Sequence, residues 1–279
     1  MSSYLRLYLT VLSLFSCLII VVSFYDFKRN RILRINGLSS TIFYDDELIK
    51  SCQKNYENKD VLIVGDGDFS FSNVLSQLVG KSYLKNTSLV ATTLEDKESL
   101  ILKFPMASEN IESIIKNPNC KVEYLINATD LPLYYKNSFD VVVFNFPHWN
   151  GKQNNKYNRH LLFNFLNHTK MALRDDNCCI LVTLNENQSG AYVDSFLQWK
   201  ETWQLTHYAA QANLLLTSID NFLNESFARA GYTPTGRRGI SSKFPVRAHV
   251  YRLQQPVNGI KAIQGIPIHF PLFLSHLSY

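Results

Sequence analysis

The sequence predicts an α/β fold whose core is a doubly wound, mostly parallel sheet. Between Asp60 and Leu253, short apolar runs of strand length alternate with segments of helical periodicity. The first apolar run, Val61–Val64, contains no polar residue, which is typical of a strand buried on both faces, and it leads directly into a turn with two glycines. This alternation indicates parallel strands joined by helices that cover both faces of the sheet.

The predicted elements follow one another in regular order. Strands are expected at Val61–Val64, Leu89–Leu94, Lys121–Ile126, Phe139–Phe144, Cys178–Leu184 and Ala248–Leu253. Helices are expected at Phe71–Tyr83, Lys97–Phe104, Ala107–Asn117, Asn158–Arg174 and Ile219–Ala230. Trp199 and Trp203 have helical spacing, and we interpret them as packing residues rather than as part of a ligand site.

The composition is that of an ordinary globular protein, with 46% hydrophobic and 18% charged residues over 279 positions. A net charge of +5 permits binding to nucleic acid without requiring it. The five cysteines show no C-x-x-C spacing. We therefore expect reduced thiols and no metal site.

The N-terminal segment departs from this soluble character. Leu7–Tyr25 contains no charged residue and is just long enough to cross the core of a bilayer. Basic residues between Lys28 and Arg34 favour an uncleaved anchor with the following domain in the cytosol. The alternatives are a cleaved signal peptide and a misassigned start codon, and without the segment the protein would be nucleolar or cytoplasmic.

Four parts of the chain follow from these observations. We expect a membrane anchor or signal segment at 1–30, a linker at 31–59, the α/β domain at 60–253 and a proline-containing tail at 254–279. Within the linker, Tyr44–Leu48 suggests a short helix.

A glycine-containing loop follows the first predicted strand and consists of Gly65, Asp66, Gly67, Asp68, Phe69 and Ser70. The glycines permit a tight turn in which a ligand can approach backbone N–H groups. The two acids would repel a pyrophosphate and would instead suit a cationic ligand, such as the sulfonium and amino groups of S-adenosylmethionine. The pattern predicts a nucleotide-cofactor loop, and a plain turn between strand and helix is the alternative.

Polar residues at the next two predicted strand ends would complete a cofactor site, because ligands of such sheets bind at the carboxyl ends of the strands. Glu95 is expected to accept the hydroxyls of a ribose, although it could instead cap the next helix. Asn127 and Ala128 follow the third predicted strand, where an amide side chain can contact an adenine edge. Asp130 could equally cap a turn before Pro132.

The fourth predicted strand ends in the strongest catalytic candidate, formed by Asn145, Phe146, Pro147 and His148. An Asn braced by a following proline can hold a planar nucleobase, and Asn145 is also expected to contact the cofactor. The neighbouring aromatic ring can stack on the base, and His148 can take or relay a proton. A cis-proline turn with a hydrogen-bonded histidine is the alternative.

Together these motifs resemble the ribosomal RNA uridine-N3 methyltransferase-like family. The resemblance covers about Asp60–Leu253. It rests on five sequence segments: Val64–Ser72, Ala91–Glu95, Phe139–His148, Asn158–Arg159 and Leu181–Leu184. Gly231–Tyr232 followed by Arg237–Gly239 is similar to the end of the family pattern.

The resemblance implies a Rossmann-like methyltransferase that depends on S-adenosylmethionine, in a family whose fungal members modify large-subunit ribosomal RNA. It predicts an RNA methyltransferase, with N3 of a uridine in ribosomal RNA as the methylated atom. Phosphate contacts are expected from Lys152, Lys156, Arg159, Arg237 and Arg238. Expected partners are the RNA and, through the N-terminal segment, a membrane, with the protein as a monomer. The alternatives are a catalytically inactive methyltransferase-like scaffold at a membrane and an enzyme that methylates a small molecule.

Overall fold

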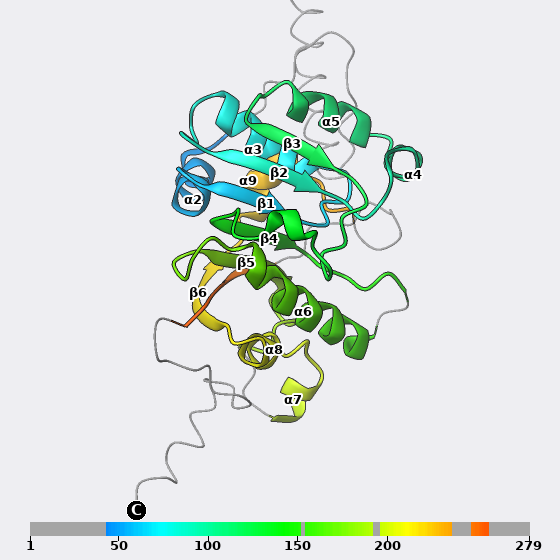
Figure 1. Cartoon of the computed structure of the whole chain (residues 1–279), viewed down its shortest axis with the longest axis vertical. Coiled ribbons are helices and arrows are strands. Elements are labelled where there is room, and N and C mark those ends of the chain that lie inside the picture. Colours follow the sequence, from blue (N-terminus) through cyan, green and yellow to red (C-terminus); the bar gives the residue numbers. More distant parts are fainter. Residues whose placement is uncertain (1–42, 152–153, 192–195, 236–246, 257–279) are drawn as a thin grey trace, which may run out of the picture. The chain divides into compact units, whose positions relative to one another are not determined.

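The computed structural model describes residues 43–151, 154–191, 196–235 and 247–256 (Figure 1). The expected membrane segment, most of the expected linker, Lys152, Arg237, Arg238 and nearly all of the expected tail lie outside these residues. Among the helices in the described ranges, none is both long and apolar enough to cross a bilayer.

The described strands form one seven-stranded sheet in the order β3-β2-β1-β4-β5-β7-β6. Their bounds are β1 (Asp60–Ile63), β2 (Ser88–Thr92), β3 (Cys120–Glu123), β4 (Val141–Asn145), β5 (Cys179–Asn185), β6 (Leu215–Asn221) and β7 (Ala248–Gln254). The strands β1 to β5 are parallel, whereas β7 is antiparallel to its neighbours β5 and β6. The predicted Rossmann-like, mostly parallel sheet is confirmed.

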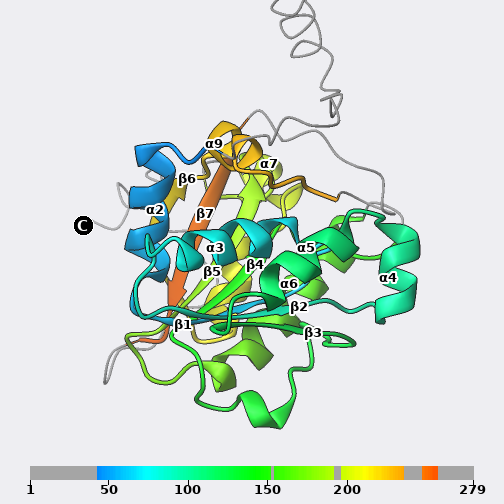
Figure 2. The same cartoon turned by 90° about the horizontal axis from the view of Figure 1, so that it is seen from above.

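Helices cover both faces of this sheet (Figures 1 and 2). They are α2 (Asp46–Tyr56), α3 (Ser70–Gly80), α4 (Lys97–Lys103), α5 (Ala107–Ile115), α6 (Asn155–Thr169), α7 (Phe196–Lys200), α8 (Leu205–Gln211) and α9 (Asn224–Arg229), with short 3-10 turns at Leu133–Tyr135 and Lys170–Ala172. Successive residues of the central strands point to opposite faces and join separate cores. Val61 and Val141 pack with α2, α3, α5 and α9, while Leu62 and Val142 pack with α6 and α8.

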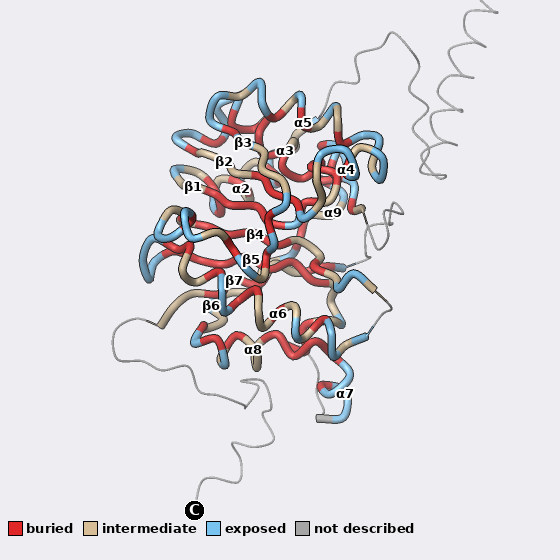
Figure 3. The backbone as a smooth tube through the Cα atoms, turned by 45° about the vertical axis from the view of Figure 1, so that its right-hand side comes forward, coloured by how far each residue is buried: buried red, intermediate tan, exposed pale blue. Residues whose placement is uncertain are grey.

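The strands in the middle of the sheet are buried on both faces (Figure 3). In β4, Val141, Val142 and Val143 expose 1% of their surface or less. This burial explains why the strands of the parallel part have continuous apolar sequences rather than alternating ones. Trp199 and Trp203 are also buried, in agreement with a packing role, but Trp203 additionally lines the cavity described below.

The folded part begins before the predicted start at Asp60. Helix α2 lies inside the segment that we interpreted as a linker, and its Leu48, Cys52 and Tyr56 belong to the core. Figure 2 shows α2 beside β7, where Arg252 donates a hydrogen bond of 2.6 Å to Asn55. The helix is capped by Asp45, whose side chain accepts from the N–H of Leu48.

The predicted helix at Ile219–Ala230 is wrong in its first part. Residues Leu215–Asn221 form the edge strand β6, and the helix α9 begins only at Asn224. Apolar residues at 216, 219, 222, 223 and 227 have helical spacing, which explains the error. Pairing of β6 with β7 supplies the hydrogen bonds that a local helix would have made, so the long-range contact overrides the local pattern.

Candidate active site

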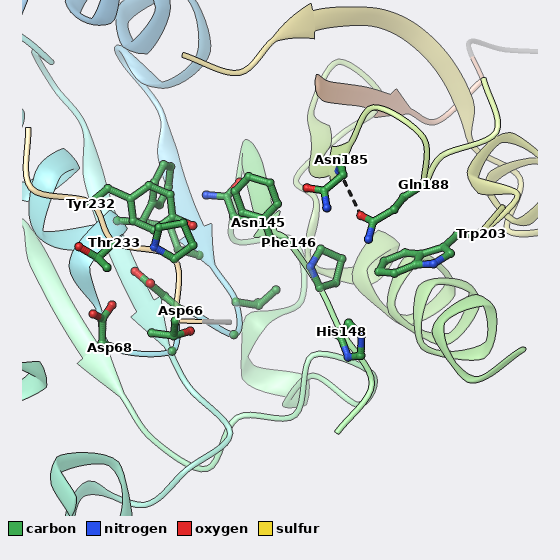
Figure 4. Close-up of a pocket in the computed structure, with 18 residues that line it drawn as sticks. Asp66, Asp68, Asn145, Phe146, His148, Asn185, Gln188, Trp203, Tyr232 and Thr233 are labelled. Atoms are coloured by element: carbon green, nitrogen blue, oxygen red, sulfur yellow. Dashed lines mark hydrogen bonds between the residues drawn. The ribbon is translucent and has the colours of Figure 1, made fainter. Parts of the chain in front are cut away.

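A cavity of about 370 Å³ lies at the carboxyl ends of β1, β4 and β5 (Figure 4). This is the edge at which open α/β sheets bind their ligands. The structure brings together at this cavity the predicted site residues Gly65, Asp66, Gly67, Asp68, Asn145, Phe146, Pro147 and His148. The ends of the first and fourth predicted strands therefore contribute to one site, as the sequence indicated.

The glycine loop has little room for side chains at its two glycines. Gly65 has a φ of +64°, and a Cβ atom there would lie 2.7 Å from the ring of Phe144. A Cβ atom at Gly67 would collide with the side chain of Thr235. Both positions therefore require glycine. Gly65 needs it for its positive φ and the nearby ring of Phe144, and Gly67 needs it because the side chain of Thr235 approaches closely.

The acids of this loop cap helix α3. The carboxylate of Asp66 accepts hydrogen bonds from the N–H and the hydroxyl of Ser72, at 2.8 and 2.5 Å. Asp68 accepts from the N–H of Ser70 at 3.0 Å. The residue at the N-cap, Phe69, has no side chain that can accept a hydrogen bond, so the acids satisfy N–H groups at the start of the helix.

Burial changes the ionisation of the groups at this end of the cavity. It raises the pKa of Asp66 to about 7, and the neighbouring charge of Asp68 contributes to the same shift. Burial also raises the pKa of Asp68. The pKa of Tyr232 is far above its usual value because the phenol is buried and faces these two acids, so this phenol stays neutral.

The end of β4 carries an amide group without a complete set of partners. The Oδ1 atom of Asn145 accepts a hydrogen bond of 2.5 Å from the hydroxyl of Thr183 on β5. Its Nδ2 atom is buried and has no hydrogen-bond partner among the described residues. The Oδ1 atom of Asn185, at the end of β5, is in the same situation. Buried polar groups nearly always have partners, and both residues line the cavity, so a ligand bound there can supply the missing partners.

Phe146 turns the chain into the cavity directly after Asn145. It has a φ of +48°, which is unusual for a residue with a large side chain. Its N–H donates to the carbonyl of Thr183, and its ring packs edge-on against Phe222. The described residues contain no cis peptide bond, so the turn at Pro147 differs from the cis-proline alternative. Phe146, in the left-handed conformation, therefore changes the direction of the chain.

His148 is held in one orientation by its neighbours. Its Nδ1 atom lies 2.7 Å from the carbonyl oxygen of Trp149, and its ring lies edge-on to Trp203 at 6.1 Å. A carbonyl oxygen can only accept, so Nδ1 carries a proton in this contact. In the neutral imidazole, Nε2 is then the acceptor, which is the form that a general base requires.

Glu95 and Asn127 lie together but do not line this cavity. The loops after β2 and β3 are joined where Leu125 donates to the carbonyl of Glu95 and Ile126 donates to that of Thr93. The Glu95 carboxylate pairs with Lys103 at 2.5 Å, and both side chains are about one third exposed. The Oδ1 atom of Asn127 accepts from the N–H and the hydroxyl of Thr129.

The remaining predicted cofactor residues also lie outside the cavity lining. Ala128 is buried next to Asn127. Phe69 is fully buried in the core, and Ser70 is also buried. The Ser70 hydroxyl lies 3.1 Å from both the N–H and the carbonyl of Thr233. Ser70 therefore joins the glycine loop to the chain that follows α9.

The cavity also contains residues that the sequence analysis did not assign to the site, namely Asn185, Gln188, Trp203, Tyr232, Thr233, Pro234 and Thr235. Figure 4 shows Asn185, Gln188 and Trp203 on the side of His148, and Tyr232 and Thr233 on the side of Asp66. The strand-end rule could have indicated Asn185, since it ends β5. No local pattern could have placed Tyr232–Thr235 over the glycine loop.

The predicted RNA-contact residues have different surroundings. Arg159 donates hydrogen bonds to the carbonyl oxygens of Lys200 and Thr202, and so it fixes the end of α7 against α6. Lys156 is exposed on α6. No group of three or more His, Cys, Asp or Glu residues in the described part of the chain could hold a metal ion.

The sequence model of the BMT5-like family, described as rRNA (uridine-N3-)-methyltransferase BTM5-like, matches residues 62–236. The chain belongs to this family. The resemblance seen in the sequence motifs is confirmed, and S-adenosyl-L-methionine is the cofactor.

Curated relatives of the BMT5-like chain include much longer proteins. Human ferredoxin-fold anticodon-binding domain-containing protein 1 is 29% identical over 206 residues, which are 71% of this chain and 32% of the human protein. Heavy metal-associated isoprenylated plant protein 41 of Arabidopsis thaliana is 32% identical over 132 residues, or 43% of this chain and 24% of the plant protein. The chain thus spans a third or less of these relatives.

The chain also resembles solved structures, among them a SAM-dependent methyltransferase from Aquifex aeolicus. The two chains share 15% identity with a TM-score of 0.45, and the match covers 79% of this chain and 95% of the Aquifex chain. The 30S ribosomal A1408 methyltransferase from an uncultured bacterium gives 14% identity, a TM-score of 0.43, and coverage of 77% and 95%.

Proposed function

We propose that the protein is an RNA methyltransferase that transfers a methyl group from S-adenosylmethionine to N3 of a uridine in ribosomal RNA. Family membership supports the reaction class. The observation in the structure that best supports a nucleobase substrate is the buried, unpaired amide nitrogen of Asn145 in the same cavity as His148.

The residues at the cavity fit a cofactor of this kind. Its volume of about 370 Å³ is within the range of small-molecule sites, which is roughly 300–1,000 Å³. The backbone of Gly65–Asp68, which lines the cavity beside Asn145, would hold one part of the cofactor. Glu95, for the ribose, and Asn127 and Ala128, for the adenine, lie outside the cavity lining, so the cofactor would extend beyond the cavity toward the loops after β2 and β3. Bound there, S-adenosylmethionine supplies the methyl group.

Asn145 would orient the target base. Uracil N3 lies between two carbonyl groups, so a donor fixed on one carbonyl oxygen fixes the position of N3. The Nδ2 atom of Asn145 is such a donor, and Thr183 holds the other end of its amide. When the N3 proton leaves, negative charge develops on the carbonyl oxygens, and the same donor stabilises it more strongly than it stabilises the neutral base.

His148 would accept the N3 proton. That proton must leave before or during methyl transfer, because the nitrogen needs a lone pair to form the new bond. With Nδ1 bonded to the carbonyl of Trp149, the Nε2 atom is available as an acceptor. Phe146, with a φ of +48°, turns the chain between Asn145 and His148.

The test has two parts. Calorimetry of the purified protein with S-adenosylmethionine should show binding, whereas an inactive scaffold would show none. Mass spectrometry of nucleosides from ribosomal RNA of a null strain should then show the loss of 3-methyluridine. A lost methyl group on ribose, or a methylated small molecule with unchanged RNA, would contradict the proposal.

We also propose that Leu7–Tyr25 anchors the protein with its catalytic domain in the cytosol, on the sequence argument given above. Protease added to sealed microsomes should digest the domain. A protected or glycosylated domain would contradict this orientation.

A further inference from the structure

The turn after His148 carries a pair of exposed aromatic rings. Trp149 and Tyr157 stack with a centroid distance of 5.3 Å and an interplanar angle of 22°. The two residues expose 39% and 48% of their surface. The other near-parallel ring pair among the described residues, Phe222 and Phe227, is buried in the core. A stacked pair at the surface leaves aromatic area that the fold itself does not use.

The position of the Trp149 main chain is well defined. Its N–H donates a hydrogen bond of 2.9 Å to the side chain of Asn158, which is fully buried. Its carbonyl oxygen accepts from the N–H of Gly151 and from Nδ1 of His148. The backbone of Trp149 thus belongs to the arrangement that holds His148, while its indole extends from that arrangement to the surface.

The charge around this pair suits a polyanion. In the sequence, residues 141–163 contain no Asp or Glu and three basic residues, Lys152, Lys156 and Arg159. Lys156, next to Tyr157 in the sequence, is exposed. One acid, Glu201, comes close through its main chain, since its carbonyl accepts from the side chain of Asn155. Basic residues beside exposed aromatic rings are typical of surfaces that bind single-stranded nucleic acid.

We propose that Trp149 and Tyr157 form a stacking platform for an unpaired RNA base next to the target nucleotide. The proposal rests on the proposed function and extends it. A base that enters the cavity leaves the stack with its neighbour, which costs free energy. Because Trp149 directly follows His148, its ring can replace the lost stacking on the neighbouring base. The site thus binds RNA in which the target and its neighbour are both unpaired.

Binding of RNA without turnover tests the platform. The probe is a single-stranded oligouridylate of about a dozen nucleotides, a length that covers one binding surface. Trp149→Ala should weaken binding on the order of tenfold, since stacking on one base contributes roughly 1–3 kcal/mol. Trp149→Phe should restore most of the affinity and guards against a variant that fails to fold. Tyr157→Ala should show a smaller loss.

Salt dependence separates stacking from charge. The slope of log affinity against log salt should be unchanged in Trp149→Ala, whereas Lys156→Ala should lower it by about one. Tyr83→Ala is a matched control, because Tyr83 is also 39% exposed and follows α3 at the end away from the glycine loop. Its RNA affinity should equal that of the wild type.

Equal RNA affinity of Trp149→Ala and wild type would overturn the platform, as would a wild type that binds no oligouridylate. Loss of binding to phosphatidylserine vesicles, with RNA affinity kept, would assign the rings to a membrane instead. Cofactor binding is measured separately by calorimetry. A platform effect without methyl transfer would support the inference while the proposed function fails.

Discussion

The glycine loop after β1 and the ends of β4 and β5 line the same cavity but differ in how their polar side chains are satisfied. In the loop, Asp66 and Asp68 accept hydrogen bonds from the start of α3. At the ends of β4 and β5, the Nδ2 atom of Asn145 and the Oδ1 atom of Asn185 have no partner among the described residues. The acids shape the loop, whereas the amides are available to a ligand.

This difference changes the interpretation of the acids. From the sequence, Asp66 and Asp68 were expected to face a cationic group of the cofactor. In the structure their carboxylates first stabilise the N-terminus of α3, and burial raises the pKa of both. Substitutions at the ends of β4 and β5 should therefore mainly reduce turnover, whereas substitutions of the acids in the glycine loop should mainly reduce stability.

Removing the imidazole at the β4 end should have the largest effect. His148→Ala should lower kcat by about 100- to 10,000-fold, the usual contribution of a general base. Single-turnover kinetics with RNA would measure this effect. A variant with full activity would show that another group removes the proton.

Asn145→Asp should lower kcat by about 100- to 1,000-fold, because it removes a donor from the developing negative charge. The new side chain has the same shape and still offers an acceptor to Thr183, so the melting temperature should change little. Calorimetry with S-adenosylmethionine serves as the control for the cofactor side. Wild-type turnover in this variant would mean that the unpaired amide has no role in the reaction.

Asp66→Ala should lose stability rather than specific chemistry. It leaves the N–H and hydroxyl of Ser72 without their acceptor, which costs about 1–3 kcal/mol of unfolding free energy. Asp66→Asn keeps an acceptor and is the matched control. Urea unfolding followed by circular dichroism measures the difference, and equal stability of the two variants would contradict the capping role.

The same residue gives the loop a dependence on pH. The pKa of Asp66 is about 7 in the folded protein against an ordinary value of 3.8, so the folded state keeps a proton that the unfolded chain releases. The contribution of Asp66 to stability is therefore largest below the ordinary value and is lost as the pH rises through 7. As the pH rises from about 4 to about 7, Asp66→Asn should therefore lose less stability than the wild type.

Glu95→Ala should have the smallest effect, a loss of cofactor affinity of about 1 kcal/mol or somewhat more, which corresponds to roughly fivefold to tenfold. In the structure the Glu95 carboxylate pairs with Lys103. A contact with the ribose would replace this ion pair, and so its net contribution to cofactor affinity is small. Isothermal titration calorimetry measures it, with Lys103→Ala as the control. Unchanged affinity in Glu95→Ala would exclude the ribose role.

The sequence was informative wherever a local pattern decides the structure. The apolar run before Gly65 and the run that ends at Asn145 each predicted a strand, and in the structure these strands pair and their ends meet at the cavity. It was uninformative where distant segments decide. The segment from Tyr232 to Thr235 reaches the glycine loop only through contacts such as that between Ser70 and Thr233. Strand β6 was missed for the same reason, since its partner β7 comes later in the chain.

The position of β7 also has a consequence for synthesis of the protein. This strand, Ala248–Gln254, is the last described element of the chain, yet it lies between β5 and β6 in the sheet. While a ribosome is still making residues before Ala248, β6 has no strand to pair with and β5 has an open edge. Until β7 emerges, the nascent chain must keep that edge from pairing with other strands, so a chain truncated before β7 is a candidate for aggregation rather than a smaller enzyme.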